Sequence, residues 1–282
     1  MKLKDLKLKL NSELSGIYPS EEMQSFFTIL SEYFLKYTRL ESVLNAAEIV
    51  SEENLQNFQD AIARLKKYEP IQYIIGQTEF YGLPFKLNRH TLIPRPETEE
   101  LVDWMVTDLR SRNSRFEILD MGTGSGCIAI SLARNLKSAK VSALDFSSEV
   151  LAQARQNSEL NKTQINFIQL DLLTASSLPQ LFDVIVSNPP YVREQEKKAM
   201  HPNVLDYEPD AALFVTNEDP LLFYRKIAAL AFRYLTPGGQ LYFEINEYLS
   251  KELMALLKGE GFLKIELKKD IFGKDRMLKC SV

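Results

Sequence analysis

The sequence predicts an α/β protein with a doubly wound, mostly parallel sheet of seven strands, a small N-terminal helical domain and a β-hairpin connector. From Glu97 onwards, short runs rich in β-branched residues alternate with helical stretches, which indicates parallel strands joined by crossover helices. The last two runs are joined only by "IFGK", too short for a crossover, so they are expected to be antiparallel. Each of the first four runs follows a helical stretch. The seven strand candidates are "RFEILDM", "AKVSALDF", "INFIQLDL", "FDVIVSN", "GQLYFEI", "FLKIELKKD" and "DRMLKCSV".

Three segments are predicted along the chain. Residues 1–75 form a helical domain, because apolar side chains recur at helical spacing, as in 23–34 and 55–65. Residues 76–96 alternate aromatic and polar side chains around "GLP", which predicts a hairpin that connects two domains. Residues 97–282 form the α/β domain.

Composition excludes several classes of protein. With 34 basic and 38 acidic residues, the formal net charge is -4, so the overall charge does not attract the chain to nucleic acid, although it leaves a local basic patch open. No direct binding to nucleic acid is expected. The N-terminus "MKLKDLKLKL" lacks the apolar run of a signal peptide, and no window is long and apolar enough to span a membrane. Two cysteines and two histidines are too few for a disulfide framework or a four-cysteine metal site. We expect a reduced, cytoplasmic protein without a metal.

A glycine-rich loop follows the first strand of the α/β domain, in "ILDMGTGSGCIAISLA". Glycines there let the backbone approach a ligand, and the helix that begins next offers free N–H groups. The predicted cofactor-binding residues of this loop are Gly122, Thr123, Gly124, Ser125 and Gly126. A dinucleotide fingerprint places its third glycine one position later, so the loop disfavours a nicotinamide oxidoreductase.

Acidic residues end the next two strands. Asp145 lies about 20 residues after the glycine loop, where a carboxylate accepts the hydroxyls of a ribose. Asp171 and Leu172 end the third strand, where an adenine can be hydrogen-bonded and covered. Because the carboxyl ends of parallel strands meet at one edge of the sheet, we expect a nucleoside cofactor across these strand ends.

The fourth strand ends in "SNPPY", at the same edge of the sheet. Pro189 and Pro190 fix the backbone and remove two N–H groups, which leaves the side-chain carbonyl of Asn188 and the main-chain carbonyl of Pro189 as acceptors. Two acceptors suit the two hydrogens of an –NH2 group, and Tyr191 offers a flat aromatic face for a planar amide or base. The alternative is a strand that two prolines simply terminate.

The glycine loop, Asp145 and "NPPY" together resemble the class I S-adenosylmethionine-dependent methyltransferases that modify planar –NH2 groups, which have a Rossmann-like fold. Two families of these enzymes share the tetrapeptide: one acts on the exocyclic amine of adenine and one on a protein glutamine amide. The segment "QYIIGQTEFYGLPFKLNRHTLIPRPETEELV" is similar to the connector of the peptide chain release factor glutamine methyltransferases. The runs "DYEPDAAL", "FYRKI" and "DIFGKDRML" also match that family.

The resemblance implies a cofactor, a substrate and roles for the residues. The cofactor is S-adenosyl-L-methionine, and the substrate is the glutamine of the Gly-Gly-Gln motif in class 1 peptide chain release factors. Catalytic roles fall to Asn188, Pro189, Pro190 and Tyr191, and Asn188 is also expected to contact the cofactor. The helical domain recognises the substrate. The alternatives are an adenine methyltransferase acting on DNA or RNA, which would need a basic face, and a binding module that has kept the fold.

Two further segments carry expectations. In "LIPRPETE", Pro94 and Pro96 stiffen the chain and Glu97 or Thr98 can cap the next helix, so one interpretation is a purely structural turn. By resemblance, the segment packs over the cofactor pocket, with Arg95 and Glu97 ordering this lid through charge contacts. In "FEINEY", Asn246 stands where the family often has glycine. We expect this position to lie away from the three strand ends that bind the cofactor, so the change is not expected to abolish activity.

Overall fold

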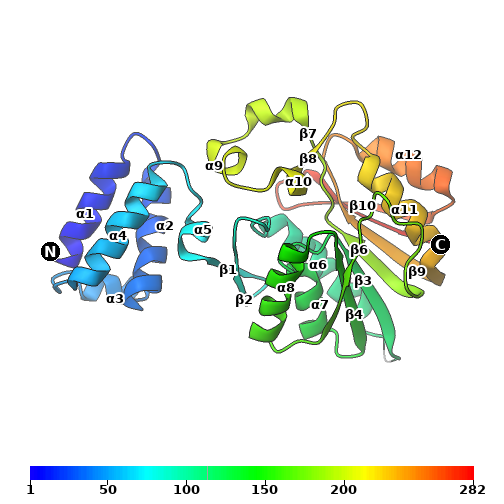
Figure 1. The fold of residues 1–282 in the computed structure, drawn as a ribbon, viewed down its shortest axis with the longest axis horizontal. Helices are drawn as coiled ribbons and strands as arrows, with labels where there is room; N and C mark the ends of the chain where they lie inside the picture. Colours follow the sequence, from blue (N-terminus) through cyan, green and yellow to red (C-terminus); the bar gives the residue numbers. More distant parts are fainter. Residues whose placement is uncertain (113) are drawn as a thin grey trace. The chain divides into compact units, whose positions relative to one another are not determined.

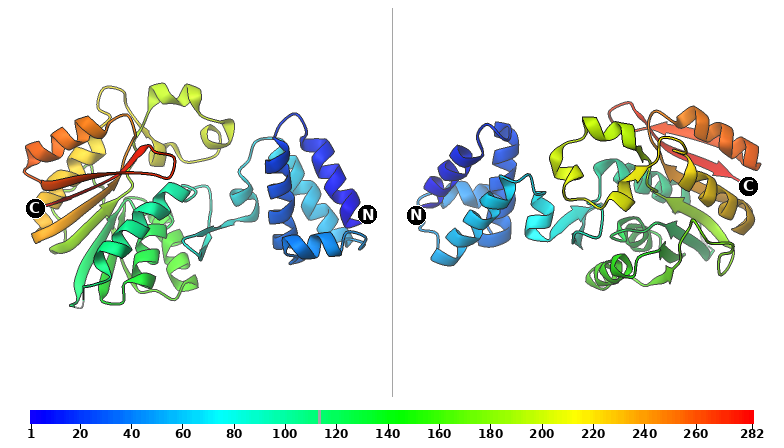
Figure 2. Two further views of the ribbon diagram at one scale, coloured as in Figure 1. Left: turned by 180° about the vertical axis from the view of Figure 1, so that it is seen from behind. Right: turned by 45° about the horizontal axis from the view of Figure 1, so that its top comes forward.

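The computed structural model describes residues 1–112 and 114–282, and the chain divides into two compact units (Figure 1 and Figure 2). The first unit comprises Met1–Gly76 together with His201–Tyr207. The second comprises Gln77–Met200 and Glu208–Val282. The sequence predicted a helical domain of residues 1–75 and no return of the chain to it further on.

The first unit is a helical bundle with its own apolar core. In α1, Leu3, Leu6, Leu10 and Leu14 are all buried, because residues three or four positions apart lie on one face of a helix. His201 packs edge-on against Tyr68, with ring centroids 5.5 Å apart. The helices of this unit are α1 (Leu3–Leu14), α2 (Ser20–Leu30), a π-helical turn (Ser31–Leu35), α3 (Arg39–Leu44), α4 (Glu52–Leu65) and α5 (Ile71–Ile75), with α9 (Pro202–Leu205) in the returning segment.

The second unit is built on a seven-stranded sheet with strand order β10-β11-β9-β6-β3-β4-β5. The strands from β9 to β5 are parallel, whereas β11 is antiparallel to both of its neighbours, which confirms the predicted sheet. Its strands are β3 (Phe116–Met121), β4 (Ala139–Asp145), β5 (Ile165–Gln169), β6 (Phe182–Ser187), β9 (Leu235–Glu244), β10 (Leu263–Lys269) and β11 (Asp275–Ser281). Smaller elements are β7 (Val192–Arg193), a 3-10 helix (Glu194–Ala199), α10 (Asp210–Leu213) and β8 (Phe214–Val215).

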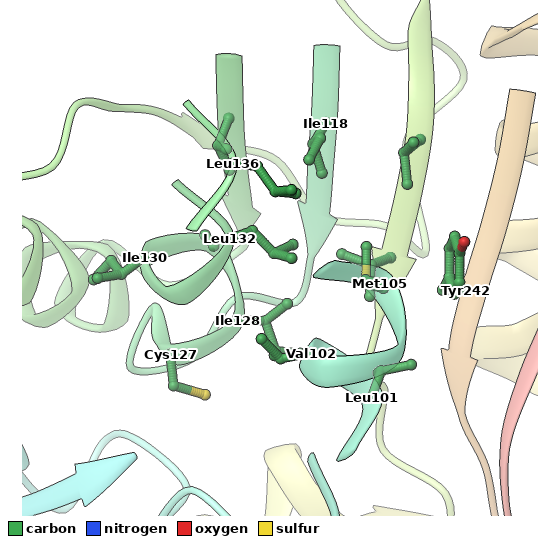
Figure 3. Close-up of a cluster of buried hydrophobic side chains, with 14 of the residues drawn as sticks. Leu101, Val102, Met105, Ile118, Cys127, Ile128, Ile130, Leu132, Leu136 and Tyr242 are labelled. Atoms are coloured by element: carbon green, nitrogen blue, oxygen red, sulfur yellow. The ribbon is translucent and has the colours of Figure 1, made fainter. Parts of the chain in front are cut away.

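Helices cover both faces of this sheet. On one face lie α6 (Pro96–Leu109) and α7 (Cys127–Asn135), whose apolar side chains pack against the strands (Figure 3). On the other lie α11 (Leu222–Tyr234) and α12 (Ser250–Glu260). Successive residues of one strand serve opposite faces, since Ile118 joins the first cluster and Leu119 the second. Both faces of β3 are therefore buried, as a parallel strand requires.

One predicted connection is wrong. A helix was expected before β6, but no helix lies in residues 170–181, all of which the structure describes. The segment instead buries Leu172 and Leu178 in the second cluster while its polar residues stay at the surface. These two buried leucines anchor a crossover that has no helix. The expectation that parallel strands are joined by helices therefore failed for this connection.

The connector is a hairpin held by an adjacent helix. Its strands β1 (Gln77–Phe80) and β2 (Leu83–Lys86) pair antiparallel. From α8 (Ser148–Leu160), Asn157 accepts a hydrogen bond from Lys86 N at 2.7 Å and donates one to Lys86 O at 3.0 Å. Just beyond α8, Asn161 donates to Pro84 O at 2.8 Å. Side-chain amides thus satisfy backbone groups on the side of β2 that, in the described part of the chain, pairs with no strand.

Candidate active site

A cavity of about 570 Å³ lies where the parallel strands of the second unit end. Small-molecule sites typically span roughly 300–1,000 Å³, so its size suits a nucleoside cofactor. Most of the predicted site residues line it: Gly122, Thr123, Gly124, Ser125, Asp145, Asp171, Leu172, Asn188, Pro189 and Pro190. Gly126 and Tyr191 are not among the lining residues. The structure therefore brings together residues from four strand ends, as the parallel order of the strands predicts.

The glycines of the loop have two different surroundings. Gly122 and Gly124 have φ angles of +74° and +55°, and no atom lies within 4 Å of where a Cβ would stand. Gly126 has a φ of +83°, but a Cβ there would lie 3.0 Å from Ile130 Cδ1 and 3.3 Å from Ala154 Cβ. The first two glycines leave the backbone open to a ligand, whereas Gly126 allows α7 to approach α8 closely.

A buried carboxyl group supports the loop from below. Thr123 Oγ1 donates to Asp120 Oδ2 at 2.7 Å, while Asp120 Oδ1 has no hydrogen-bond partner among the described residues. Asp120 is 0% exposed, and this burial raises its pKa to about 7. The protein therefore keeps a carboxyl group under the glycine loop that changes charge near neutral pH.

Asp145 is hydrogen-bonded to the loop that it was predicted to accompany. Its Oδ2 accepts from Gly124 N at 3.1 Å and its Oδ1 from Ser147 N at 3.2 Å. Burial raises the pKa of this carboxyl, and the backbone N–H donors oppose that shift. Each carboxylate oxygen accepts more than one hydrogen bond, so Asp145 retains capacity for the hydroxyls of a ribose.

Asp171 and Leu172 lie in the turn after β5. Asp171 is exposed, and its carboxylate accepts from Leu173 N at 2.9 Å and from Thr174 Oγ1 at 3.2 Å, which shapes the turn. Leu172 is buried and presents an apolar surface to the cavity. The turn thus places one acceptor and one apolar side chain at the position predicted for the adenine.

The residues of "NPPY" face in two directions. Asn188, Pro189 and Pro190 line the cavity, and Asn188 Nδ2 donates to Thr98 Oγ1 at 3.2 Å. Tyr191 packs against the second cluster, and its hydroxyl donates to Glu244 Oε1 at 2.9 Å. Because the amide nitrogen of Asn188 is engaged by Thr98, its oxygen is the end available at the cavity.

Two polar residues of this site were missed by the sequence analysis. Thr98 Oγ1 donates to Glu244 Oε2 at 2.6 Å, and Glu244 is 1% exposed. Thr98 was predicted only as a possible cap, but α6 has Arg95 as its N-cap and no side-chain capping bond. A signal for Glu244 existed, because it is an acidic residue at the carboxyl end of β9, like Asp145 at the end of β4.

Asn246 contacts the end of the tetrapeptide "NPPY". Its Nδ2 donates to Tyr191 O at 3.0 Å and to Glu196 Oε2 at 3.1 Å, and its Oδ1 accepts from Tyr248 N at 2.9 Å. The side chain thus joins the end of "NPPY" to the segment after β9. A glycine at this position has no side chain to make these contacts, so the asparagine adds support to the tetrapeptide.

The segment "LIPRPETE" contributes to the lining of the cavity and is held by an ion pair. Arg95 Nη2 lies 2.5 Å from Glu208 Oε1, and Glu208 Oε2 accepts from Ile93 N at 3.1 Å. Glu208 is buried and follows directly on the segment that belongs to the first unit. The predicted charge contact of Arg95 thus has Glu208 as its partner, from 113 residues further along the chain.

The cavity fits a nucleoside cofactor. It combines open loop backbone at Gly122 and Gly124, a hydrogen-bonding carboxylate at Asp145 and apolar cover from Leu172. The aromatic side chain of Phe146 also lines it. Within residues 1–112 and 114–282, no group of three or more His, Cys, Asp or Glu is arranged to hold a metal ion, and no helix has the length and apolarity to cross a membrane.

Comparisons with known proteins agree with this geometry. The family model of the methyltransferase small domain matches residues 99–206, and that of the PrmC N-terminal domain matches residues 11–76. A crystal structure of a methyltransferase from Pyrococcus furiosus has a TM-score of 0.55 and 21% identity, covering 79% of this chain and 98% of that one. That likeness supports the class I methyltransferase fold.

Two curated relatives extend over almost the whole chain. The release factor glutamine methyltransferase of Flavobacterium psychrophilum is 50% identical and covers 100% of this chain and 99% of its own. The protein of the same name from Bacteroides thetaiotaomicron is 45% identical and covers 96% of this chain and 97% of its own. The chain therefore belongs to the release factor glutamine methyltransferase family.

Proposed function

We propose that this protein transfers a methyl group from S-adenosyl-L-methionine to the glutamine side-chain amide nitrogen in the Gly-Gly-Gln motif of class 1 peptide chain release factors. The observation that carries the proposal is that Asn188 and Pro189 line the same cavity as Gly122, Gly124 and Asp145. An acceptor pair suited to an –NH2 group thus lies beside a site suited to a nucleoside. The relatives that match the full chain are named for this reaction.

The cofactor half of the cavity is assigned to the glycine loop and the next two strand ends. When bound, S-adenosylmethionine supplies a methyl group attached to a positively charged sulfur. The backbone of the loop from Gly122 to Ser125 approaches the cofactor, Asp145 accepts the ribose hydroxyls, and Asp171 and Leu172 hold the base. Gly126 contributes indirectly, because it permits the packing that positions α7 behind the loop.

The acceptor half is assigned to "NPPY". An amide nitrogen is a poor nucleophile because its lone pair is delocalised into the carbonyl. The Asn188 side-chain oxygen and the Pro189 main-chain carbonyl accept its two hydrogens, which aims the nitrogen and favours the positive charge that grows on it during transfer. Pro190 stiffens the turn, and Tyr191 fixes its end through Glu244. The surplus proton leaves after the methyl group has been transferred.

The proposal assigns a separate role to each of three segments of the chain. Residues 97–282 carry the chemistry, residues 76–96 connect, and residues 1–75 recognise the release factor. A separate family model matches within the N-terminal segment, and α3 exposes Leu40, Val43 and Leu44, large apolar side chains of the kind that contact other proteins. Replacing Leu40 and Val43 together by Asp should raise KM for an intact release factor and leave KM for a short Gly-Gly-Gln peptide unchanged.

The proposal includes the location and partners of the protein. Release factors act on ribosomes in the cytoplasm, so we assign the enzyme to that compartment. We assign it no direct nucleic-acid partner, and the formal net charge of -4 supports this assignment.

The decisive experiment offers three substrates to the purified protein with methyl-labelled S-adenosylmethionine. These are a class 1 release factor, the same factor with the Gly-Gly-Gln glutamine replaced by alanine, and adenine-containing DNA or RNA. Label should enter only the first, and mass spectrometry should place one methyl group on the glutamine. Label in the nucleic acid, or in both forms of the release factor, would overturn the proposal.

A further inference from the structure

A chain of hydrogen bonds runs from Asn188 into the protein interior. Asn188 Nδ2 donates to Thr98 Oγ1 at 3.2 Å, and Thr98 Oγ1 donates to Glu244 Oε2 at 2.6 Å. We infer that Thr98 and Glu244 are positioning residues that decide which end of the Asn188 side-chain amide faces the methyl acceptor. This inference rests on the proposed function and assigns roles to two residues outside the tetrapeptide.

The need for such a device follows from the chemistry of the amide. The oxygen and nitrogen ends of an asparagine side chain have nearly the same shape but opposite hydrogen-bonding character. With its oxygen towards the cavity, Asn188 accepts a hydrogen from the glutamine –NH2. With the amide flipped, the –NH2 group of Asn188 faces the –NH2 group of the glutamine. Two donors then oppose each other, and the substrate is repelled. Packing alone discriminates poorly between these two orientations.

Thr98 alone does not settle the orientation, because a hydroxyl can either donate or accept. Glu244 removes this freedom. The single proton of the Thr98 hydroxyl is used in the bond to Glu244, so Thr98 can only accept from Asn188. Only the nitrogen end of the amide can donate, and the oxygen end is left for the cavity.

Glu244 is itself held in place. It is the last residue of β9, its second oxygen accepts from Tyr191 at 2.9 Å, and its main-chain carbonyl accepts from Tyr224 at 3.1 Å. It is 1% exposed, so a rotation away from Thr98 would leave buried donors without a partner. Thr98 stands on the 14-residue helix α6, so both positioning residues belong to regular elements, while Asn188 lies just after the end of β6.

The first test compares two replacements of Thr98. Thr98→Val keeps the shape and removes the hydroxyl, and it should lower kcat on the release factor by about ten-fold or more. Thr98→Ser keeps the hydroxyl and should restore most of this loss. Cofactor affinity by calorimetry should change little in either variant. The melting temperature should fall in Thr98→Val, because the buried Glu244 loses a donor, and stay near the wild-type value in Thr98→Ser. Equal losses of kcat in Thr98→Val and Thr98→Ser, or an unchanged kcat in Thr98→Val, would overturn the inference.

A matched control separates positioning from general stability. Thr236 Oγ1 also donates to a carboxylate, Asp183 Oδ1 at 2.9 Å, but at the opposite ends of β9 and β6. Thr236→Val therefore removes the same kind of bond from the same sheet without touching the cavity. It should lower the melting temperature and leave kcat unchanged, because it removes a hydrogen bond far from the cavity. Parallel losses of kcat in both variants would mean that Thr98 has only a structural role.

A second test uses pH. Protonated Glu244 can donate to Thr98 and release the Thr98 hydroxyl to turn towards Asn188, so kcat should fall as this group is protonated. Burial raises the pKa of Glu244, the hydrogen bonds from Thr98 and Tyr191 and the charge of Arg276 oppose the shift, and the Glu97 carboxylate adds to it. The acid limb of kcat should therefore lie above the usual range of a glutamate.

Glu244→Gln mimics the protonated state at every pH. Its kcat should be low and should lack the acid limb of the wild type, while cofactor affinity is retained. A wild-type acid limb that persists unchanged in Glu244→Gln would exclude Glu244 as its source.

A third measurement does not depend on turnover. In protein with 15N-labelled asparagine, the signals of the Asn188 side-chain amide are assigned as those lost in Asn188→Ala. They should move in Thr98→Val and stay near their wild-type position in Thr98→Ser. If the protein methylates no release factor but the Asn188 signals respond in this way, the proposed function fails and the orientation of Asn188 stands. Signals that do not respond would overturn the inference by themselves.

Discussion

Asn157 Nδ2 donates a hydrogen bond to the main-chain carbonyl of Ser125 at 2.9 Å, which joins α8 to the glycine loop. The same amide also bonds Lys86 in the connector hairpin. Asn157 is 0% exposed, so its side-chain amide has no access to water and depends on these backbone groups for hydrogen bonds. One buried side chain therefore couples the shape of the cofactor loop to the position of the connector.

Replacing Asn157 by Asp tests this coupling. The new carboxylate would face the carbonyls of Ser125 and Lys86, which should lower the free energy of unfolding by roughly 2–4 kcal/mol. Cofactor affinity, measured by calorimetry, should fall as well because the loop loses its anchor. Asn161→Asp is the control, since Asn161 donates to Pro84 O but not to the loop. It should destabilise the protein without weakening cofactor binding, and an equal loss of affinity in both variants would refute the coupling.

Replacing Asp145 by Ala tests the ribose assignment. The change removes the carboxylate that accepts from Gly124 N and Ser147 N and leaves the ribose hydroxyls without their predicted acceptor. Cofactor affinity should fall by about ten-fold or more, because hydrogen bonds to a charged group contribute roughly 1.5–3 kcal/mol. Calorimetry with S-adenosylhomocysteine measures this directly. Unchanged affinity would show that the ribose is held elsewhere.

Asn188→Ala separates binding from chemistry. The variant loses the side-chain oxygen predicted to hold the acceptor amide but keeps the backbone fixed by Pro189 and Pro190. Turnover of the release factor should fall by roughly a hundred-fold, as for the loss of one preorganised group in a transition state, while cofactor affinity changes little. Comparable losses in both quantities would argue that Asn188 serves the cofactor rather than the acceptor.

Asp120 predicts a specific dependence of stability on pH. Because its folded-state pKa is raised to about 7, its contribution to stability is complete below about pH 4 and is lost as the pH rises through 7. Asp120→Asn keeps an acceptor for Thr123 but does not titrate. Relative to the wild type, this variant should gain stability between pH 5 and pH 8, by at most roughly 4 kcal/mol.

Urea unfolding of both proteins across this range measures the difference, and the other titrating groups cancel in the comparison. A difference between wild type and Asp120→Asn that stays constant with pH would mean that Asp120 does not titrate there.

Features set by local sequence were predictable. The strand ends at Met121, Asp145 and Ser187 follow from alternating patterns and from the glycines or prolines that come next, and parallel order then places them together. The loop and Asn188 at the cavity follow from the same argument. Local signals sufficed here because each residue is positioned by its own strand.

Features set by distant partners were not predictable in the same way. Thr98 and Glu244 are 146 residues apart, and neither sequence neighbourhood indicates the other. The irregular crossover in residues 170–181 depends on where Leu172 and Leu178 are buried, which only the assembled sheet determines. Tyr191 was expected to offer its ring to the substrate. Its hydroxyl donates to Glu244 at the end of β9, a partner that the sequence around Tyr191 does not indicate.

The return of His201–Tyr207 to the first unit affects the design of chimeric proteins made from two relatives. A chimera joined at residue 76 would combine the helices of one protein with the 201–207 segment of another. Tyr207, which donates to Lys67 O at 2.7 Å, would then meet a foreign surface. We therefore expect substrate preference to be transferred between relatives only when Met1–Gly76 and His201–Tyr207 are exchanged together. The recognition unit is encoded by two separate stretches of the gene.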